Sequence, residues 1–94
     1  MPKIVYRQHL LRRLKERQFP QDYPRRIYKE AKTYYLDKAT GHLIAIAKLE
    51  YGGKLRNLAI VFDKIGGIIE IITIYPITDE EIKNRVTTKR WTKI

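Results

Sequence analysis

The chain has no cysteine, one methionine, one tryptophan and only two histidines among its 94 residues. The absence of cysteine excludes disulfides, thiolate zinc sites and a cysteine nucleophile, and it is typical of a reducing compartment. The sequence also lacks a signal-peptide pattern and any apolar run long enough to span a membrane. We therefore expect a cytoplasmic protein, unprocessed from Met1, that makes no contact with a membrane.

Patterns typical of metal-dependent and nucleotide-hydrolysing enzymes are missing as well. Restriction-type nucleases place a lysine two residues after a metal-binding carboxylate, and neither Glu50 nor Glu70 is followed by one. His9 and His42 do not have the spacing of zinc ligands, and no glycine-rich phosphate loop is present. We expect neither a metal nor another cofactor.

Positive charge dominates the composition, with a formal net charge of +10 at pH 7. The excess lies at the two ends: residues 1–32 contain ten Lys/Arg and three acidic residues, and residues 81–94 contain five and one. Residues 33–80 are nearly balanced, with five and six. Basic ends that meet on one face would attract a polyanion, so nucleic acid is the expected partner. A docking patch for an acidic protein and a solvated basic surface remain as alternatives.

Two short helices are expected at the start of the chain. The segment from Val5 to Gln18 has leucines on one side and charged residues elsewhere, an amphipathic pattern that Phe19-Pro20 ends. Asp22 is positioned to cap a second helix, with Pro24 in its first turn, that runs through Ala31.

Four strands should follow, because β-branched and aromatic residues alternate between short glycine-containing turns. The expected strands are Thr33 to Asp37, His42 to Tyr51, Leu55 to Asp63 and Ile68 to Tyr75. Strict alternation in the last strand places Ile69, Ile71, Thr73 and Tyr75 on one face, and Ile68, Glu70, Ile72 and Ile74 on the other. These segments predict an antiparallel meander with one apolar face covered by the helices.

After Pro76, the sequence Thr78-Asp79-Glu80-Glu81 is a capping-box pattern that predicts a helical turn through Arg85 or Val86. The remaining tail is basic and contains Trp91. The expected fold is a single α+β domain over residues 1–94, with two N-terminal helices packed on a four-stranded antiparallel sheet and a short basic C-terminal segment. Exposed strand edges leave a homodimer open.

The first helix carries the most suggestive pattern for function. His9, Arg13 and Arg17 stand four residues apart and therefore line one helix face. An imidazole titrates near neutral pH, and guanidinium groups beside it can hold a phosphate while the imidazole moves a proton. The alternative is that these arginines are solvated, or pair with Glu16, Asp63 or Glu70.

Together with the segment Ile72-Thr73-Ile74-Tyr75-Pro76, this helix resembles a small prokaryotic family of uncharacterised domains. In that family a His-x-x-x-Arg-Leu/Met-x-x-Arg helix precedes a four-stranded sheet. The family is grouped with RelE/ParE-like toxins and with metal-independent ribonucleases of the barnase, colicin and RelE type. The resemblance covers roughly residues 6–76 and implies RNA cleavage by attack of the neighbouring 2′-hydroxyl.

The resemblance and the chemistry together suggest roles for individual residues. The expected catalytic residues are His9 for proton transfer, Arg13 and Arg17 for the phosphate, and Tyr75 for orientation. The expected RNA-binding residues are Arg12, Thr73, Arg85, Lys89, Arg90 and Trp91. For Arg12 a solvated surface residue, and for Trp91 a core plug, are the favoured alternatives. His42 follows Gly41 and is interpreted as a turn residue.

The preferred functional hypothesis is a toxin of a type II toxin–antitoxin pair that acts as a metal-independent endoribonuclease. Its expected partners are RNA, including ribosome-bound mRNA, and a small acidic antitoxin protein. The alternative is a non-catalytic nucleic-acid or ribosome-binding module that uses the same charges only to hold phosphate. A ParE-like toxin directed at DNA gyrase is a further alternative.

Overall fold

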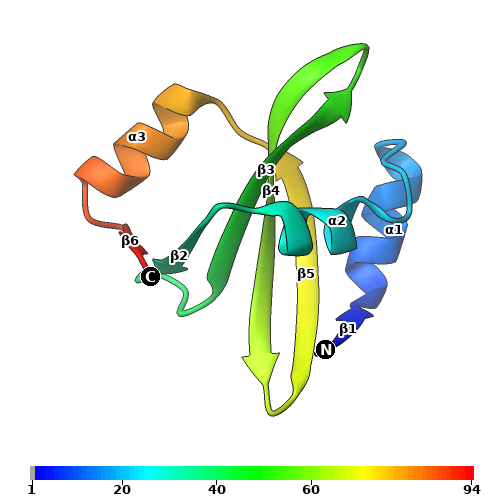
Figure 1. Cartoon of the computed structure of the whole chain (residues 1–94), viewed down its shortest axis with the longest axis horizontal. Helices are drawn as coiled ribbons and strands as arrows, with labels where there is room; N and C mark the ends of the chain where they lie inside the picture. Colours follow the sequence, from blue (N-terminus) through cyan, green and yellow to red (C-terminus); the bar gives the residue numbers. More distant parts are fainter. Residues whose placement is uncertain (1) are drawn as a thin grey trace.

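The computed structural model describes residues 2–94 as a mixed sheet with three helices (Figure 1). The elements are β1 (Lys3–Tyr6), α1 (Gln8–Glu16), α2 (Tyr23–Glu30), β2 (Thr33–Asp37), β3 (Leu43–Tyr51), β4 (Lys54–Ile65), β5 (Ile68–Pro76), α3 (Asp79–Thr87) and β6 (Trp91–Lys93).

The sheet has six strands in the order β1-β5-β4-β3-β2-β6, and β1 runs parallel to β5 while the other pairs are antiparallel. The prediction of two helices on a four-stranded antiparallel sheet is therefore wrong, although the α+β class is correct. The two missed strands are short and lie at the ends of the chain. Each forms only by pairing with a strand distant in sequence, so neither has a local signal.

The first correction concerns the start of the chain. Val5 and Tyr6, which the periodicity assigned to a helix, belong to β1, and α1 begins only at Gln8. Arg7 has extended backbone (φ −71°, ψ 154°), and its N–H donates to the carbonyl of Ile71 at 3.1 Å. At the other end, the predicted basic tail contains β6, which pairs with Tyr35–Asp37 of β2. These two strands cover part of the sheet edges that suggested a homodimer.

The central meander follows the predicted turns closely. Gly52 and Gly53 form the two-residue connection between β3 and β4, with φ of +65° and +85°. A tight hairpin turn of this kind needs positive φ at both positions, which glycine adopts without steric cost. The same turn sets the register, because Tyr51 pairs with Lys54 and the rest of both strands follows.

A bulge in β5 overturns the predicted assignment of its faces. Phe62 pairs with Ile71 but Val61 pairs with Thr73, so Ile72 is the extra residue. As a result Ile74 joins Ile69 and Ile71 in the main core, and Thr73 and Tyr75 turn to the opposite face. The prediction that all of Ile69, Ile71, Thr73 and Tyr75 share a face is wrong.

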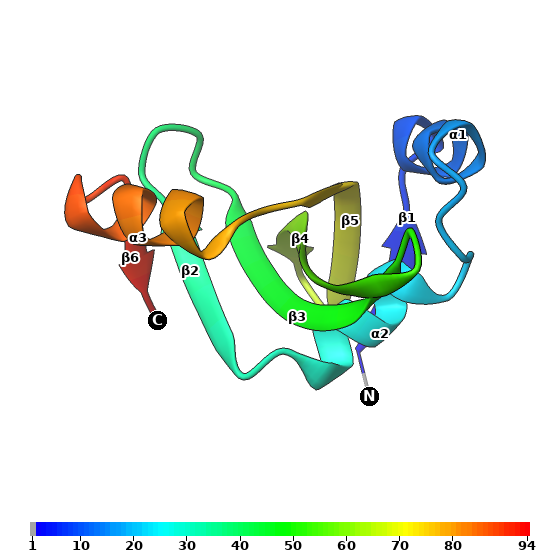
Figure 2. The same cartoon turned by 90° about the horizontal axis from the view of Figure 1, so that it is seen from above.

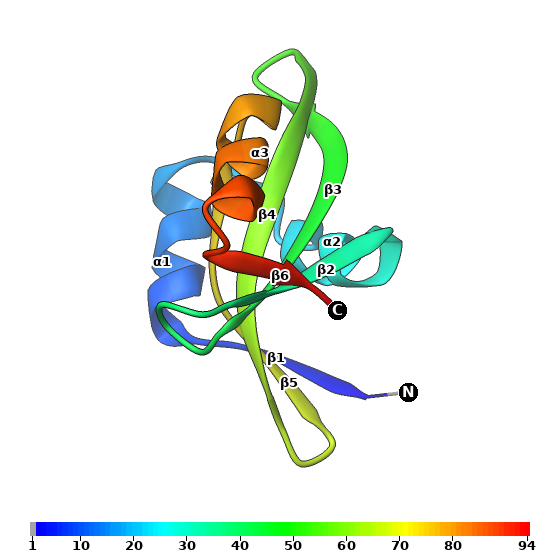
Figure 3. The same ribbon diagram turned by 90° about the vertical axis from the view of Figure 1, so that its left-hand side faces the viewer.

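Both faces of the sheet are covered. The main core contains Leu10 and Leu14 of α1, Ile27 of α2 and the inward residues of β3 to β5. A second, smaller core on the opposite face contains Ile44, Ala59, Ile77 and Trp91, against which Ile82 of α3 packs. Figures 2 and 3 show α3 beside β6, and Figure 2 shows α1 and α2 at the other end of the sheet, near β1.

The helix ends match the sequence signals in part. The capping box of α3 is present, because the Thr78 hydroxyl accepts from the Glu81 N–H at 3.1 Å and the Glu81 carboxylate accepts from the Thr78 N–H. Asp22 occupies the N-cap position of α2, but its side chain makes no capping hydrogen bond. Within residues 2–94, no helix combines the length and the apolar character that a membrane span requires.

Candidate nucleic-acid interface

The predicted phosphate-binding residues of the first helix do lie together. His9, Arg13 and Arg17 line a hollow of about 130 Å³ with Arg12 and Glu16. Below we call this set of residues the α1 hollow. Leu10 and Leu14 are buried on the adjoining face of the helix, so positions 9, 13 and 17 lie along its flank, with Arg13 partly covered.

The arginines of the α1 hollow have no carboxylate partner within residues 2–94. The predicted pairs with Asp63 and Glu70 do not form, because both acids bind Arg7 instead. The cations that form ion pairs with acidic side chains in the described part of the chain are Arg7, Arg26, Arg90 and, when protonated, His42. The positive charge of the α1 hollow is therefore free to bind an external anion.

Arg13 differs from its neighbours because it is only partly exposed. Its Nε is buried and has no hydrogen-bond partner among residues 2–94. Because this Nε is covered, an external phosphate would bind the Nη groups at the outer end of the guanidinium. The covered Nε limits the movement of Arg13, which makes it the most firmly positioned cation of the α1 hollow.

A second basic group lies where α3 and β6 meet the sheet. We call Asp37, Tyr75, Arg85, Arg90 and Trp91 the C-terminal cluster. Arg90 binds the carboxylate of Asp37, with Nε 3.3 Å from Oδ1. Asp37 is 5 % exposed, and burial alone would raise its pKa, but the Arg90 guanidinium and the Ala39 N–H hold the pKa below its ordinary value.

Trp91 fills the second core and is 1 % exposed. Its ring packs against Tyr35 at 5.4 Å between centroids, and the Arg85 guanidinium lies 5.4 Å from its centre. The indole Nε1 is buried near Asp37 and has no hydrogen-bond partner within residues 2–94. This burial agrees with the core-plug interpretation, and it leaves no open ring face on which a base could stack.

Tyr75 lies beside Arg85 on the α3 side of the sheet. Burial raises the pKa of its hydroxyl, and the Arg85 guanidinium opposes this shift without cancelling it. The phenol therefore stays protonated at neutral pH and can donate a hydrogen bond. It cannot serve as a phenolate base there.

The other predicted RNA-binding residues occupy different positions. The Thr73 hydroxyl is buried without a partner in the described chain, on the same face as Tyr75. Lys89 is exposed in the turn after α3 and adopts a positive φ of 65°.

The structure thus divides the predicted site into two groups. His9, Arg13 and Arg17 line the α1 hollow, whose lining comes from α1 and its C-cap residue, whereas Tyr75 belongs to the C-terminal cluster. Strand β5 connects them, because α1 packs against β5 and Thr73 and Tyr75 project from it toward the α3 side. Helices α1 and α3 pack against opposite faces of the sheet, and Figure 2 shows β4 and β5 between them.

One polar group was missed by the sequence analysis. The Nδ1 of His42 lies 2.7 Å from Asp63 Oδ1, and Arg7 bridges Asp63 and Glu70, with its Nη2 2.7 Å from Glu70 Oε1. His42 does lie in the connection between β2 and β3, as interpreted from the sequence, but its contact with Asp63 was not predicted. The signal was present, since the Gly52-Gly53 turn fixes a register in which His42 lies opposite Asp63.

No cluster of three or more His, Cys, Asp or Glu side chains suited to a metal ion occurs within residues 2–94. Comparisons with protein-family models, curated proteins and solved structures gave no match to this chain. Functional assignment therefore depends on the site itself.

Proposed function

We propose that the protein is a metal-independent endoribonuclease with its centre at the α1 hollow. The observation that carries the proposal is the grouping of His9, Arg13 and Arg17 in one hollow, with no acidic residue paired to the two arginines. A nearby imidazole and unpaired guanidinium groups supply a proton-transfer group and anion ligands, which phosphodiester cleavage requires.

In the proposed reaction, the 2′-hydroxyl of the RNA attacks the adjacent phosphorus while its proton passes to His9. The bond from phosphorus to the 5′ oxygen breaks, leaving a 2′,3′-cyclic phosphate, and the 5′ oxygen takes up a proton from water to become a 5′-hydroxyl. Arg13 and Arg17 bind the phosphate oxygens as negative charge increases on them. Tyr75, held in its protonated form, donates a hydrogen bond to RNA that crosses β5.

The biological role proposed with this activity is that of a toxin in a type II toxin–antitoxin pair. It is supported by the resemblance described above and by the net charge of +10, which suits a small acidic antitoxin. The alternative given above is a module that binds RNA without cleaving it. It would use the same unpaired cations, and the experiment below distinguishes it from the endoribonuclease.

The deciding experiment incubates end-labelled RNA with the purified chain in EDTA and identifies the fragment ends. We expect cleavage that leaves cyclic phosphates, and a loss of about 100- to 10,000-fold in rate for His9→Ala. Arg13→Ala should lower both the cleavage rate and RNA affinity. Inducible expression of wild type and His9→Ala in cells then tests whether growth arrest depends on the same residue.

The chain offers two matched controls. His42→Ala removes the other histidine, and Arg7→Ala removes an arginine that is paired with Asp63 and Glu70. Both should retain activity, once denaturation curves show that they are folded. Activity lost in His42→Ala but kept in His9→Ala would move the centre to the His42–Asp63 pair, and RNA bound but intact would favour the non-catalytic module.

A further inference from the structure

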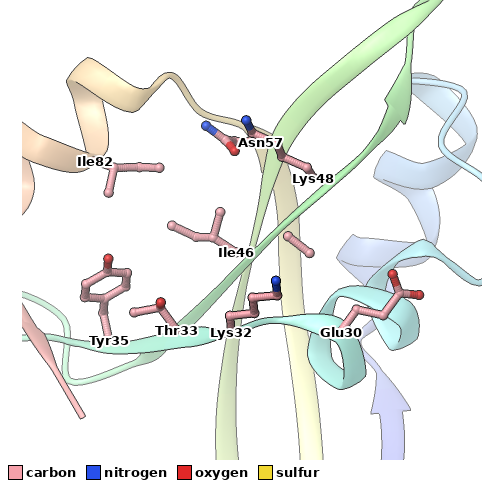
Figure 4. Close-up of a pocket in the computed structure, with 9 residues that line it drawn as sticks. Glu30, Lys32, Thr33, Tyr35, Ile46, Lys48, Asn57 and Ile82 are labelled. Carbon is pink, nitrogen blue, oxygen red and sulfur yellow. The ribbon is translucent and has the colours of Figure 1, made fainter.

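A second hollow, of about 460 Å³, opens between α3 and the start of β2 (Figure 4). Its floor is apolar and comes from three elements: Tyr35 of β2, Ile46 of β3 and Ile82 of α3. The size falls within the range of sites that enclose small molecules, about 300–1,000 Å³. We call it the β2–α3 pocket, and it shares no lining residue with the α1 hollow.

The rim of this pocket is positively charged. Lys32 and Lys48 line it, and neither lysine forms an ion pair with an acidic side chain within residues 2–94. The pocket also contains Glu30, but its carboxylate is bound by Arg26, with Oε2 2.8 Å from Nε. Figure 4 shows Lys32 and Lys48 on opposite sides of Ile46. An anionic group above the apolar floor would therefore meet two available ammonium groups.

Asn57 adds a polar contact of fixed orientation. Its Nδ2 donates to Asp79 Oδ1 at 2.8 Å, which ties the amide to the first turn of α3. The amide Oδ1 has no hydrogen bond within the described chain and remains an acceptor. The hydroxyl of Tyr35 is likewise without a hydrogen bond there and can donate or accept.

We propose that the β2–α3 pocket binds one nucleotide of single-stranded RNA, with the base on the apolar floor beside Tyr35 and a phosphate between Lys32 and Lys48. An apolar surface, an aromatic ring, one oriented amide and two unpaired cations form the combination by which proteins bind unstacked nucleotides. A docked helical peptide would need an elongated groove with several apolar anchors, and the pocket is a single bounded hollow.

This inference rests on the proposed function, because it adds a second RNA contact to a strand held at the α1 hollow. The pocket lies on the α3 side of the sheet, as do Thr73 and Tyr75 of β5. An RNA strand that leaves the α1 hollow at the β5 end of the sheet and crosses β5 and β4 on the α3 side can therefore reach the pocket. The base held in the pocket would influence which sequence lies at His9.

The test compares two double variants that change the charge equally. Lys32→Glu/Lys48→Glu reverses the rim of the pocket, whereas Lys54→Glu/Lys83→Glu changes two exposed lysines that do not line it. Affinity for a labelled single-stranded RNA is measured by fluorescence anisotropy at low salt. We expect a loss of about tenfold or more for the pocket variant and about two- to threefold for the control, because only the first removes direct phosphate contacts.

A second measurement uses nucleoside monophosphates as probes in NMR titrations of the wild-type protein. The methyl groups of Ile46 and Ile82 and the side-chain amide of Asn57 should shift with a nucleoside monophosphate and shift much less with inorganic phosphate. Equal affinity losses in the two double variants would overturn the inference, as would identical shifts with inorganic phosphate. So would shifts induced by an acidic peptide but by none of the nucleotides.

The two proposals fail in distinguishable ways. If wild-type protein binds no RNA, the proposed function and this inference both fall. If RNA binding is weakened by Arg13→Ala but unaffected by Lys32→Glu/Lys48→Glu, the inference alone is wrong. Circular dichroism and denaturation curves for each variant show that the comparison is made between folded proteins.

Discussion

The α1 hollow and the C-terminal cluster both contain arginines, but these arginines differ in their partners. In the C-terminal cluster, Arg90 binds the buried carboxylate of Asp37, and Arg85 lies over Trp91. In the α1 hollow, Arg13 and Arg17 have no acidic partner within residues 2–94. Sequence analysis assigned Arg13 and Arg17 to catalysis, and Arg85 and Arg90 to RNA binding.

The difference shows that an excess of basic residues does not by itself mark an anion-binding site. A cation that satisfies a buried acid is part of the folded structure, and moving it to an external phosphate would leave that acid uncompensated. A cation without an internal partner can bind an external phosphate without leaving a buried acid uncompensated. Substitutions in the C-terminal cluster should therefore lower stability, whereas substitutions in the α1 hollow should lower RNA affinity.

The largest expected effect is the loss of stability in Trp91→Ala. Truncating a buried tryptophan leaves a cavity and typically costs about 3–5 kcal/mol of unfolding free energy. Urea denaturation measures this change. Trp91→Phe retains most of the apolar volume and should lose much less. A Trp91→Ala protein as stable as wild type would show that the indole is not a structural plug.

A smaller effect is expected for Asp37→Asn. Near neutral pH it should lose about 1–2 kcal/mol, since a hydrogen bond to a charged group contributes about 1.5–3 kcal/mol and the exposed side of Arg90 is screened by water. The folded-state pKa of Asp37 lies below its ordinary value, so its stabilising contribution is complete above that value, near about 4.

This contribution should disappear as the pH falls through the lower, folded-state pKa of Asp37. The gap in stability between wild type and Asp37→Asn is therefore expected to shrink in acid, as followed by urea denaturation at a series of pH values. Asp22→Asn, which changes an exposed acid, is the control. A gap that stays constant into strong acid would contradict the role given to the charge of Asp37.

In the α1 hollow, Arg13→Ala should weaken RNA binding several-fold with little change in unfolding free energy. Loss of one phosphate contact should also reduce the slope of log affinity against log salt concentration by about 1. Arg7→Ala, whose arginine is already paired with Glu70, should show neither change. The contrast between the regions breaks down if Arg13→Ala destabilises the protein as much as Asp37→Asn does.

The smallest effect is expected at the start of α3. Thr78→Ala removes the capping hydrogen bonds and should cost about 1 kcal/mol. Helix α3 carries Arg85, which lies over Trp91, and contributes no residue to the α1 hollow. The variant should therefore lower stability without changing RNA affinity under conditions in which it remains folded. Thr87→Ala, at the last residue of the helix, is the matched control. Thermal denaturation together with RNA titration measures both properties.

Local signals in the sequence predicted most of the central fold. The strand Thr33–Asp37 has the predicted bounds, and the glycine turns place the hairpins correctly. The capping box at Thr78 also forms as expected. Each of these features depends on neighbouring residues, through backbone φ, side-chain alternation or a capping hydrogen bond.

The failures all involve residues distant in sequence. Strand β1 forms through parallel pairing with β5, and β6 through pairing with β2. The bulge at Ile72 depends on how β5 adapts to β4, and it decides that Tyr75 faces α3 instead of the main core. No alternation rule applied to β5 alone could have found it.

The same division applies to the functional residues. The sequence by itself determined that His9, Arg13 and Arg17 share one face of a helix, because the helical repeat brings every fourth residue into line. Only the tertiary structure decided which cations are free. Packing brings Arg7 to Asp63 and Glu70, and Arg90 to Asp37, whereas Arg13 and Arg17 form no ion pair with an acidic side chain among residues 2–94.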